Sequence, residues 1–302
     1  MLKTLQNAFK IKEIREKLLY TFFMLVVIRL GSQLPIPGVD TKFFAELFAR
    51  QSSDAFGFFN TITGGSFTNM SVFALSITPY ITSSIIMQLL TIAIPKLEEM
   101  QREGEDGRKK IAEYTRYLTV GLALMQSIAM SVGFGGRGLL IDFNAVSVIV
   151  AIATMTSGSA MLMWIGERIT ERGVGNGISI VLLFNIISTL PSDMITLYER
   201  FLVGKNVPVA TVSLIIILAI ILAMVVFVIV LQDGERRIPV QYSKKMQGRK
   251  MVGGQSTNIP LKVNTAGVIP VIFASSLMSF PVVIAEFFQV DYATFGGKIL
   301  RA

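Results

Sequence analysis

The sequence predicts an all-α polytopic membrane protein, and three observations support this expectation: its composition, its long apolar stretches and the residue types it lacks. Of 302 residues, 52% are hydrophobic and 16% are charged, with a mean hydropathy of +0.61. Soluble domains carry about 25% charged residues. Cysteine and histidine are absent, which excludes disulfides, zinc sites and thiol or imidazole catalysis. We therefore expect neither a metal site nor a cofactor.

Seven stretches are long and apolar enough to cross a bilayer, for which roughly 20 residues are needed. The first is not a cleaved signal peptide, because it lacks a small-residue cleavage site and is followed by six further apolar stretches. The expected spans are residues 18–34, 71–94, 117–134, 145–166, 174–190, 208–231 and 266–285.

Lysine and arginine are distributed unevenly between the loops that join these spans. Loops on the side of the N-terminus hold 20 of them and loops on the other side hold 7, with Arg29 inside the first span set aside. An excess of positive charge marks the cytosolic side, so we expect a cytosolic N-terminus. Residues 1–17 are expected to be an amphipathic anchor on anionic lipids, because Leu2, Leu5 and Phe9 share a face among several lysines.

The region before the second span is aromatic and apolar but too short to cross the membrane. Residues 56–67 include Gly64 and Gly65, which interrupt any helix there. One interpretation is a half-helix at about 55–69 that re-enters the protein from outside, since irregular backbone at membrane depth needs protein or water around it. The other is an amphipathic segment on the outer interface. The residues alone leave both open.

The second span combines a stripe of isoleucines with many polar side chains. Ile77, Ile81 and Ile85 recur at a spacing of four and therefore share one helix face. Such a stripe is more often packing than a pore wall. Polar side chains would be unfavourable against lipid, so they indicate a helix inside a bundle, beside a cavity; they are Thr78, Tyr80, Thr82, Ser83, Ser84 and Gln88.

Two later spans have related features. The fifth follows a glycine-rich start and places Leu182 and Ile186 again at a spacing of four. The seventh carries Ile272 just after Pro270, with Pro281 further along. Prolines within a helix predict kinks, and hence a mobile seventh span.

The loop at 232–265 between the last two spans is basic. Ile238, Val240 and Tyr242 alternate with polar neighbours, which predicts an extended or hairpin finger. A topology signal explains the charge but not this alternation, whereas docking of a large anionic partner such as ribosomal RNA fits both. The candidate docking residues are Arg236, Arg237, Lys244, Lys245, Arg249 and Lys250.

Four strings, at residues 78–81, 170–179, 235–244 and 255–270, resemble the SecY family of bacterial protein-translocation channels, and the resemblance extends over all 302 residues. It implies a pore ring of large aliphatic residues at Ile77, Ile81, Leu182, Ile186 and Ile272, where leucine at 182 is a mild departure. It implies a plug with Phe58, Phe59, Ile62, Thr63, Gly64 and Gly65. The implied lateral gate includes Ile85, Gln88, Ser275 and Ser276.

The family has ten spans in two inverted halves of five. By that pattern, residues 18–190 are a first half with its plug, and residues 191–302 begin the second half with two spans. We expect a fragment of a ten-span protein, although a natural truncation stays open. The resemblance also implies a bacterial plasma membrane location and several partners: the small subunits SecE and SecG, the motor ATPase SecA, the translating ribosome and signal sequences.

The expected function is that of a pore-forming subunit, not an enzyme, which passes unfolded polypeptides and releases transmembrane segments sideways. A narrow apolar ring dewets when empty and accepts a chain of any sequence. The alternative is a secondary transporter with a broken-helix substrate site. Such transporters usually place ionisable groups within their spans, whereas the only clear candidate here is Arg29, which lies close to the outer end of its helix. An intramembrane enzyme would need paired Asp or a Ser–Lys dyad at membrane depth, and the sequence offers neither.

Overall fold

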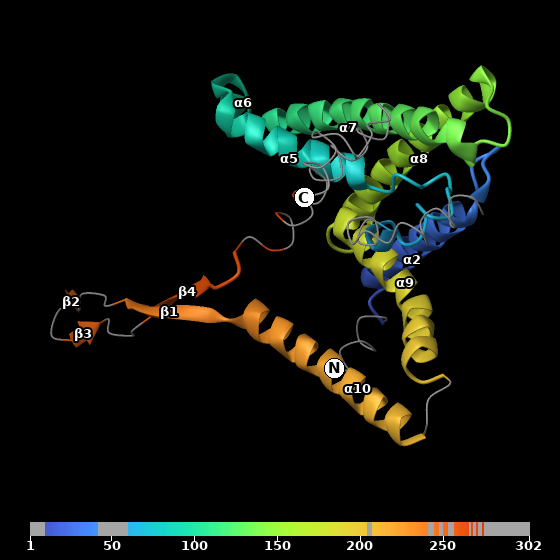
Figure 1. The fold of residues 1–302 in the computed structure, drawn as a ribbon. Coiled ribbons are helices and arrows are strands. Elements are labelled where there is room, and N and C mark those ends of the chain that lie inside the picture. The colour runs from blue at the N-terminus through green and yellow to red at the C-terminus, as the bar shows by residue number, and fades with distance from the viewer. Residues whose placement is uncertain are drawn as a thin grey trace, which may run out of the picture. The chain divides into compact units, whose positions relative to one another are not determined.

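The computed structural model describes residues 10–41, 60–203, 207–240, 245–247, 250–252 and 257–265, together with residues 267, 270 and 274. The chain divides into two compact units, with the border between Pro191 and Ser192 and a return to the first unit at Ile272. Each unit is described by itself. Figure 1 shows the elements: α2 (Lys12–Gln33), α5 (Thr78–Ala93), α6 (Pro95–Arg102), α7 (Glu105–Phe134), η1 (Gly135–Leu139), α8 (Ala145–Arg172), α9 (Gly177–Phe201), α10 (Val207–Asp233), β1 (Glu235–Val240), β2 (Lys245–Gln247), β3 (Lys250–Val252) and β4 (Thr257–Lys262).

The described residues are mostly helical, as expected. They contain fewer candidate membrane spans than the seven that the sequence predicts. Four helices, α7 to α10, are long and apolar enough to cross a membrane, and the bent pair of α5 and α6 makes a fifth if it counts as one span. Helix α2 coincides with the expected first span, but charged residues fill its first turns from Lys12 to Lys17. The expected span at 266–285 lies almost wholly outside the described residues.

The second span does not begin at residue 71, as the apolar run suggested. Helix α5 starts at Thr78, because Met70 and Ser76 adopt positive φ angles of 42° and 51° that a continuous right-handed helix does not allow. Its other end is set by Pro95, which opens α6 after a bend of 102°. A proline cannot donate the backbone hydrogen bond that would continue α5.

The fifth span is also longer than expected. Helix α9 continues through Pro191 to Phe201, whereas the sequence indicated an end at 190. An interior proline removes one backbone donor and crowds the preceding turn, but the residues after Pro191 remain helical. At the other end of the chain, Lys12 to Lys17 belong to α2 itself, so the expected border between the anchor and the first span lies within one helix.

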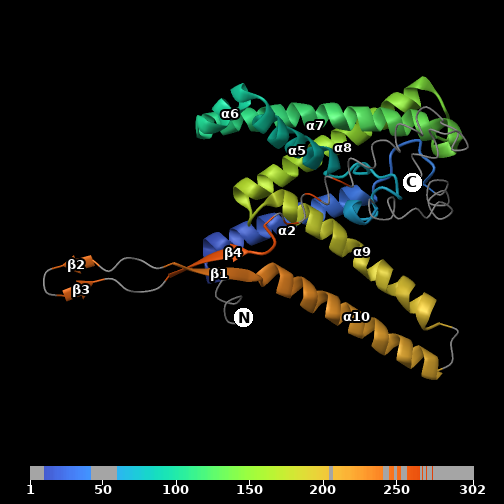
Figure 2. The same ribbon diagram turned by 60° about the vertical axis from the view of Figure 1, so that its left-hand side comes forward.

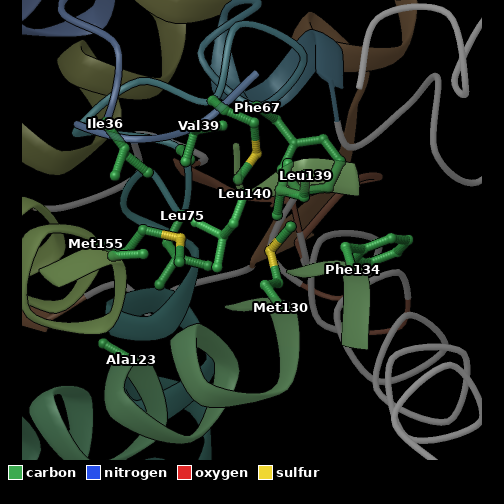
Figure 3. Packing of buried hydrophobic residues seen from close by; sticks show 13 residues of the cluster. Ile36, Val39, Phe67, Leu75, Ala123, Met130, Phe134, Leu139, Leu140 and Met155 are labelled. Atoms are coloured by element: carbon green, nitrogen blue, oxygen red, sulfur yellow. The ribbon is translucent and has the colours of Figure 1, made fainter. Parts of the chain in front are cut away.

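The first unit packs around two apolar clusters. One of them includes Phe67 and Leu75 together with Met130 and Phe134 of α7 and Met155 of α8. Figure 3 shows these side chains gathered between the helices. Figures 1 and 2 show α5 and α6 lying along α7, with α8 beside them. Phe67 and Leu75, which precede α5, are therefore enclosed by helices on more than one side.

The second unit consists of the end of α9, helix α10 and two antiparallel ribbons. The most apolar 18-residue stretch of α10 has a mean hydropathy of 3.7 and no buried side chain, as suits a helix that faces lipid. Strand β1 pairs with β4, with Ile238 opposite Ile259, and β2 pairs with β3. Figure 2 shows β1 and β4 side by side beyond the end of α10. This confirms the expected hairpin finger in the basic loop.

Candidate functional site

The chain between residues 60 and 77, here called the turn segment, enters the first unit without forming a full helix. Residues 60–63 are helical and residues 64–70 are turns. Gly64 and Gly65 have φ angles of 68° and 79°, a left-handed conformation that glycine adopts without steric cost. The expected half-helix at 55–69 therefore ends at Thr63. Its beginning, with Phe58 and Phe59, lies outside the described residues.

The turn segment is buried against helices α2 and α9. Ile62 and Thr63 are enclosed, with Thr63 fully inaccessible. The carbonyl oxygen of Gly64 accepts a hydrogen bond from Arg29 Nη1 at 3.3 Å. A Cβ atom at Gly64 would lie 3.0 Å from both the carbonyl oxygen of Asn185 and the hydroxyl of Ser188. The backbone of this turn thus lies directly on α9.

The other end of the turn segment is held by polar contacts as well. Ser76 accepts a hydrogen bond at Oγ from Asn185 Nδ2 at 3.1 Å, and its carbonyl accepts one from Ser159 Oγ at 3.3 Å. All three residues are buried. Because a buried polar group without a partner costs free energy, these contacts stabilise the strained backbone of Ser76 just before α5.

The isoleucine stripe of α5 follows immediately. Ile77, Ile81 and Ile85 are buried in one cluster with Leu162 and Ile165 of α8, and Leu182 of α9 packs at the edge of this cluster. Three of the five expected ring residues, Ile77, Ile81 and Leu182, thus lie together. Ile186 is 40% exposed and is not among the members of this cluster. Ile272 lies outside the described residues.

Of the expected gate residues, Ile85 belongs to the same cluster and Gln88 is exposed, while Ser275 and Ser276 lie outside the described residues.

The polar face of α5 does contact its neighbours. Ser83 and Thr119 share a buried hydrogen bond of 2.5 Å that joins α5 to α7. The many hydroxyls of the second span were the signal for this contact, although its partner in α7 was not foreseen.

The basic finger places its charges on two different faces. Successive residues of a strand point to opposite faces, and residues directly opposite each other in a pair share a face. Arg237 lies opposite Pro260, next to the Glu235–Lys262 pair, whereas Arg236 lies opposite Leu261. The sequence alone had grouped the two arginines as one set.

One face of this ribbon is therefore largely apolar: Ile238, Ile259 and Leu261 are exposed on it, and its polar residues are Arg236 and Thr257. Lys245 and Lys250 lie on β2 and β3, and Lys244 and Arg249 fall outside the described residues. Within the described part of the chain, no group of three or more Asp or Glu side chains could hold a metal ion.

These features define a class: a helical, multi-pass membrane protein whose bundle encloses a buried turn segment beside an apolar stripe. A family model described as SecY matches residues 71–301. The chain belongs to the SecY family.

The relatives found by sequence agree. The protein translocase subunit SecY of Halalkalibacterium halodurans is 45% identical over 298 residues, covering 97% of this chain and 68% of that protein. The SecY subunit of Escherichia coli strain K12 is 43% identical over 280 residues, covering 91% and 62%. The chain thus spans about two thirds of the length of the curated relatives it matches.

Solved structures share the fold. A structure of a protein conducting channel matches with a TM-score of 0.57, covering 91% of this chain and 59% of that one. Sec61 in the canine ribosome–channel complex matches with a TM-score of 0.54 and the same coverage. Both are 20% identical in sequence, so they show the fold alone. The alternative of a secondary transporter receives no support from these matches.

Proposed function

We propose that this chain is the pore-forming part of a protein-conducting channel of the bacterial plasma membrane, which moves unfolded polypeptides across and releases transmembrane segments into lipid. Membership of the SecY family suggests this activity. The observation that carries it is the position of the isoleucine stripe: Ile77 and Ile81 directly follow the buried turn segment and meet Leu182 of α9. An apolar constriction and a seal therefore adjoin each other.

The constriction works because its side chains are apolar. Ile77, Ile81 and Leu182, completed by Ile186 and Ile272, offer no hydrogen bonds or charges to a passing chain. A narrow apolar neck dewets when empty, and this blocks ions at rest. It also accepts a polypeptide of any sequence. The turn segment, as the plug with Ile62, Thr63, Gly64 and Gly65, closes the neck from one side.

Lateral release requires that the bundle separate between neighbouring helices. We place this gate at Ile85 and Gln88 of α5 and at Ser275 and Ser276 of the seventh span. The full protein would have ten spans, of which residues 18–190 supply five and residues 191–302 supply two, with the N-terminus and residues 1–17 on the cytosolic leaflet among anionic lipids. The 20 to 7 excess of Lys and Arg supports this orientation.

The channel itself supplies no chemistry, so the energy comes from cytosolic partners. Arg236 and Arg237 on β1 are both exposed. Arg237, on the polar face, suits an anionic surface such as ribosomal RNA, and the related Sec61 was solved in a ribosome–channel complex. The motor ATPase SecA is the second candidate for this finger. SecE and SecG are the expected companions in the membrane, and signal sequences are the expected ligands of the gate.

The decisive experiment reconstitutes the full-length channel, with its companion subunits, in lipid vesicles. An unfolded secretory polypeptide added with the motor ATPase and ATP should become protected from external protease. Vesicles without the channel are the control. Protection that does not depend on the channel, or accumulation of a small solute in place of the polypeptide, would refute the proposal and favour the transporter.

A further inference from the structure

Arg29 is the charged residue within the expected first span at 18–34, and the structure gives it two neutral partners. Its Nη1 atom donates to the carbonyl oxygen of Gly64 at 3.3 Å and to Ser188 Oγ at 3.2 Å. The side chain is half-buried. A charge at membrane depth is costly unless polar groups surround it, so both contacts stabilise Arg29 where it stands.

Helix α9 presents its acceptor to Arg29 in a defined direction. Ser188 donates its own hydroxyl proton to the carbonyl of Asn185 at 2.7 Å, which leaves the lone pairs of its oxygen for Arg29. One turn earlier, the side chain of Asn185 donates to Ser76 Oγ. Two residues of α9 thus hold both ends of the turn segment, at Gly64 through Arg29 and at Ser76 directly.

We propose that Arg29, Asn185 and Ser188 are positioning residues that form a polar latch and keep the turn segment in its sealed position. This inference rests on the proposed function, because it assigns the turn segment the role of a seal. Movement of the segment away from α9 breaks the contacts at Gly64 and at Ser76 together. It also leaves the Arg29 charge with fewer partners, and hydrogen bonds to charged groups are the stronger ones.

Such a latch sets the threshold for opening. If the sealed and open states are in equilibrium, removing contacts made only in the sealed state raises the open population. Less binding energy from a signal sequence is then needed to open the channel. The simpler alternative is that Arg29 only anchors α2 in the bundle, in which case its loss lowers stability but not the seal.

The test measures resting ionic current through the full-length channel in planar bilayers, together with export of a polypeptide whose signal sequence is impaired. Arg29→Gln and Ser188→Ala should each raise the resting open population, Arg29→Gln by about tenfold, which corresponds to about 1.4 kcal/mol. Arg29→Lys keeps the charge and should lie closer to the unaltered protein. Export of the impaired substrate should rise in the same order.

Ser127→Ala is the matched control. Like the Ser188 hydroxyl, the Ser127 hydroxyl donates to a carbonyl three residues earlier, that of Leu124 at 2.9 Å, but its side-chain partner at 2.9 Å is Thr156, which joins α7 to α8. The resting current of this variant should be unchanged. Should Arg29→Gln fail to accumulate in the membrane, Ser188→Ala decides alone, since it deletes one partly buried hydroxyl without adding volume.

The outcomes separate the two proposals. The latch is overturned if the resting current is unchanged in Ser188→Ala, and in Arg29→Gln where that variant accumulates, while ordinary substrates are exported normally. The proposed channel function would then still stand. A lower yield without added current would point to the anchoring role and would equally overturn the latch. Failure of the unaltered protein to export any polypeptide would instead overturn the proposed function.

Discussion

Asn185 of α9 donates a hydrogen bond from Nδ2 to Ser76 Oγ over 3.1 Å, although the two residues lie 109 positions apart in the chain. Ser76 has a φ of 51°, which is rare for a residue with a side chain. The contact therefore fixes an unfavourable backbone conformation at the point where the turn segment becomes α5, just ahead of the isoleucine stripe.

Loss of this contact should destabilise the first unit. Asn185→Ala leaves the buried Ser76 hydroxyl without its donor, which costs about 1–3 kcal/mol. We expect a lower midpoint of thermal unfolding in detergent. Thr154→Ala, which removes an exposed hydroxyl bonded within α8, serves as control and should leave the midpoint nearly unchanged. Equal midpoints for both variants would contradict the structural role of Asn185.

A methyl group at Gly64 should push the turn segment away from α9. Its Cβ would lie 3.0 Å from two α9 atoms, and the φ of 68° disfavours any side chain. Gly65→Ala has a similar φ of 79° but meets nothing within 4 Å, so it tests backbone strain alone. Resting current should increase in Gly64→Ala and increase less in Gly65→Ala. The reverse order would show that contact with α9 is unimportant.

Thr63 should report the position of the turn segment directly. The residue is fully buried, so a cysteine introduced there should react slowly with a membrane-impermeant thiol reagent at rest. Labelling should become faster while a polypeptide is being translocated, because the plug has moved. A cysteine at the exposed Asp142, in the loop between α7 and α8, supplies a reference rate. If Thr63→Cys is labelled equally in both states, the segment is an interfacial element and not a plug.

Polar substitution of the ring should admit water and ions. An Ile81→Asn, Ile186→Asn double variant removes apolar wall from α5 and α9, and dewetting depends on that wall. We expect a resting current without any substrate, and easier opening by weak signal sequences. Ile92→Asn, on the same helix as Ile81 but exposed, is the control. A silent double variant that still inserts and folds would remove the ring from the mechanism.

The two arginines of the finger should differ in effect because they lie on opposite faces of the ribbon. Arg237→Glu alters the polar face, so it should weaken ribosome binding. The slope of the logarithm of the binding constant against the logarithm of the salt concentration should fall by about one. Arg236→Glu places a carboxylate beside exposed apolar residues and should affect a protein partner more than RNA. Lys109→Glu, an exposed reversal at the start of α7, controls for net charge. Identical losses for the two arginines would contradict the two-faced ribbon.

Much of this architecture follows from local sequence patterns. Helices α8 and α10 coincide with apolar stretches of the required length, α7 contains one but begins earlier, at Glu105, and the alternation at Ile238 and Val240 is realised in β1. These elements depend on hydrophobicity and period, which are properties of short windows.

The features that the sequence did not reveal depend on distant partners. The apolar run before Thr78 does not become helix, because Asn185 and Ser159 bind the backbone turn at Ser76 from α9 and α8. Arg29 was evident as an unusual residue, but its acceptors on Gly64 and Ser188 are 35 and 159 positions away. Spacing within one element carries no information about such contacts.

The bend at Pro95 has a consequence for the thickness of membrane that this part of the bundle can match. Helix α5 has 16 residues, which span about 24 Å at 1.5 Å each, whereas the hydrocarbon layer is about 30 Å thick. We expect the turn segment to cover the remaining distance; its backbone is paired with the loop that follows α2, where Val72 N donates to the Leu34 carbonyl and Ile36 N donates to the Met70 carbonyl. In a thicker or thinner bilayer, the mismatch is therefore taken up by a hydrogen-bonded loop and not by a helix end.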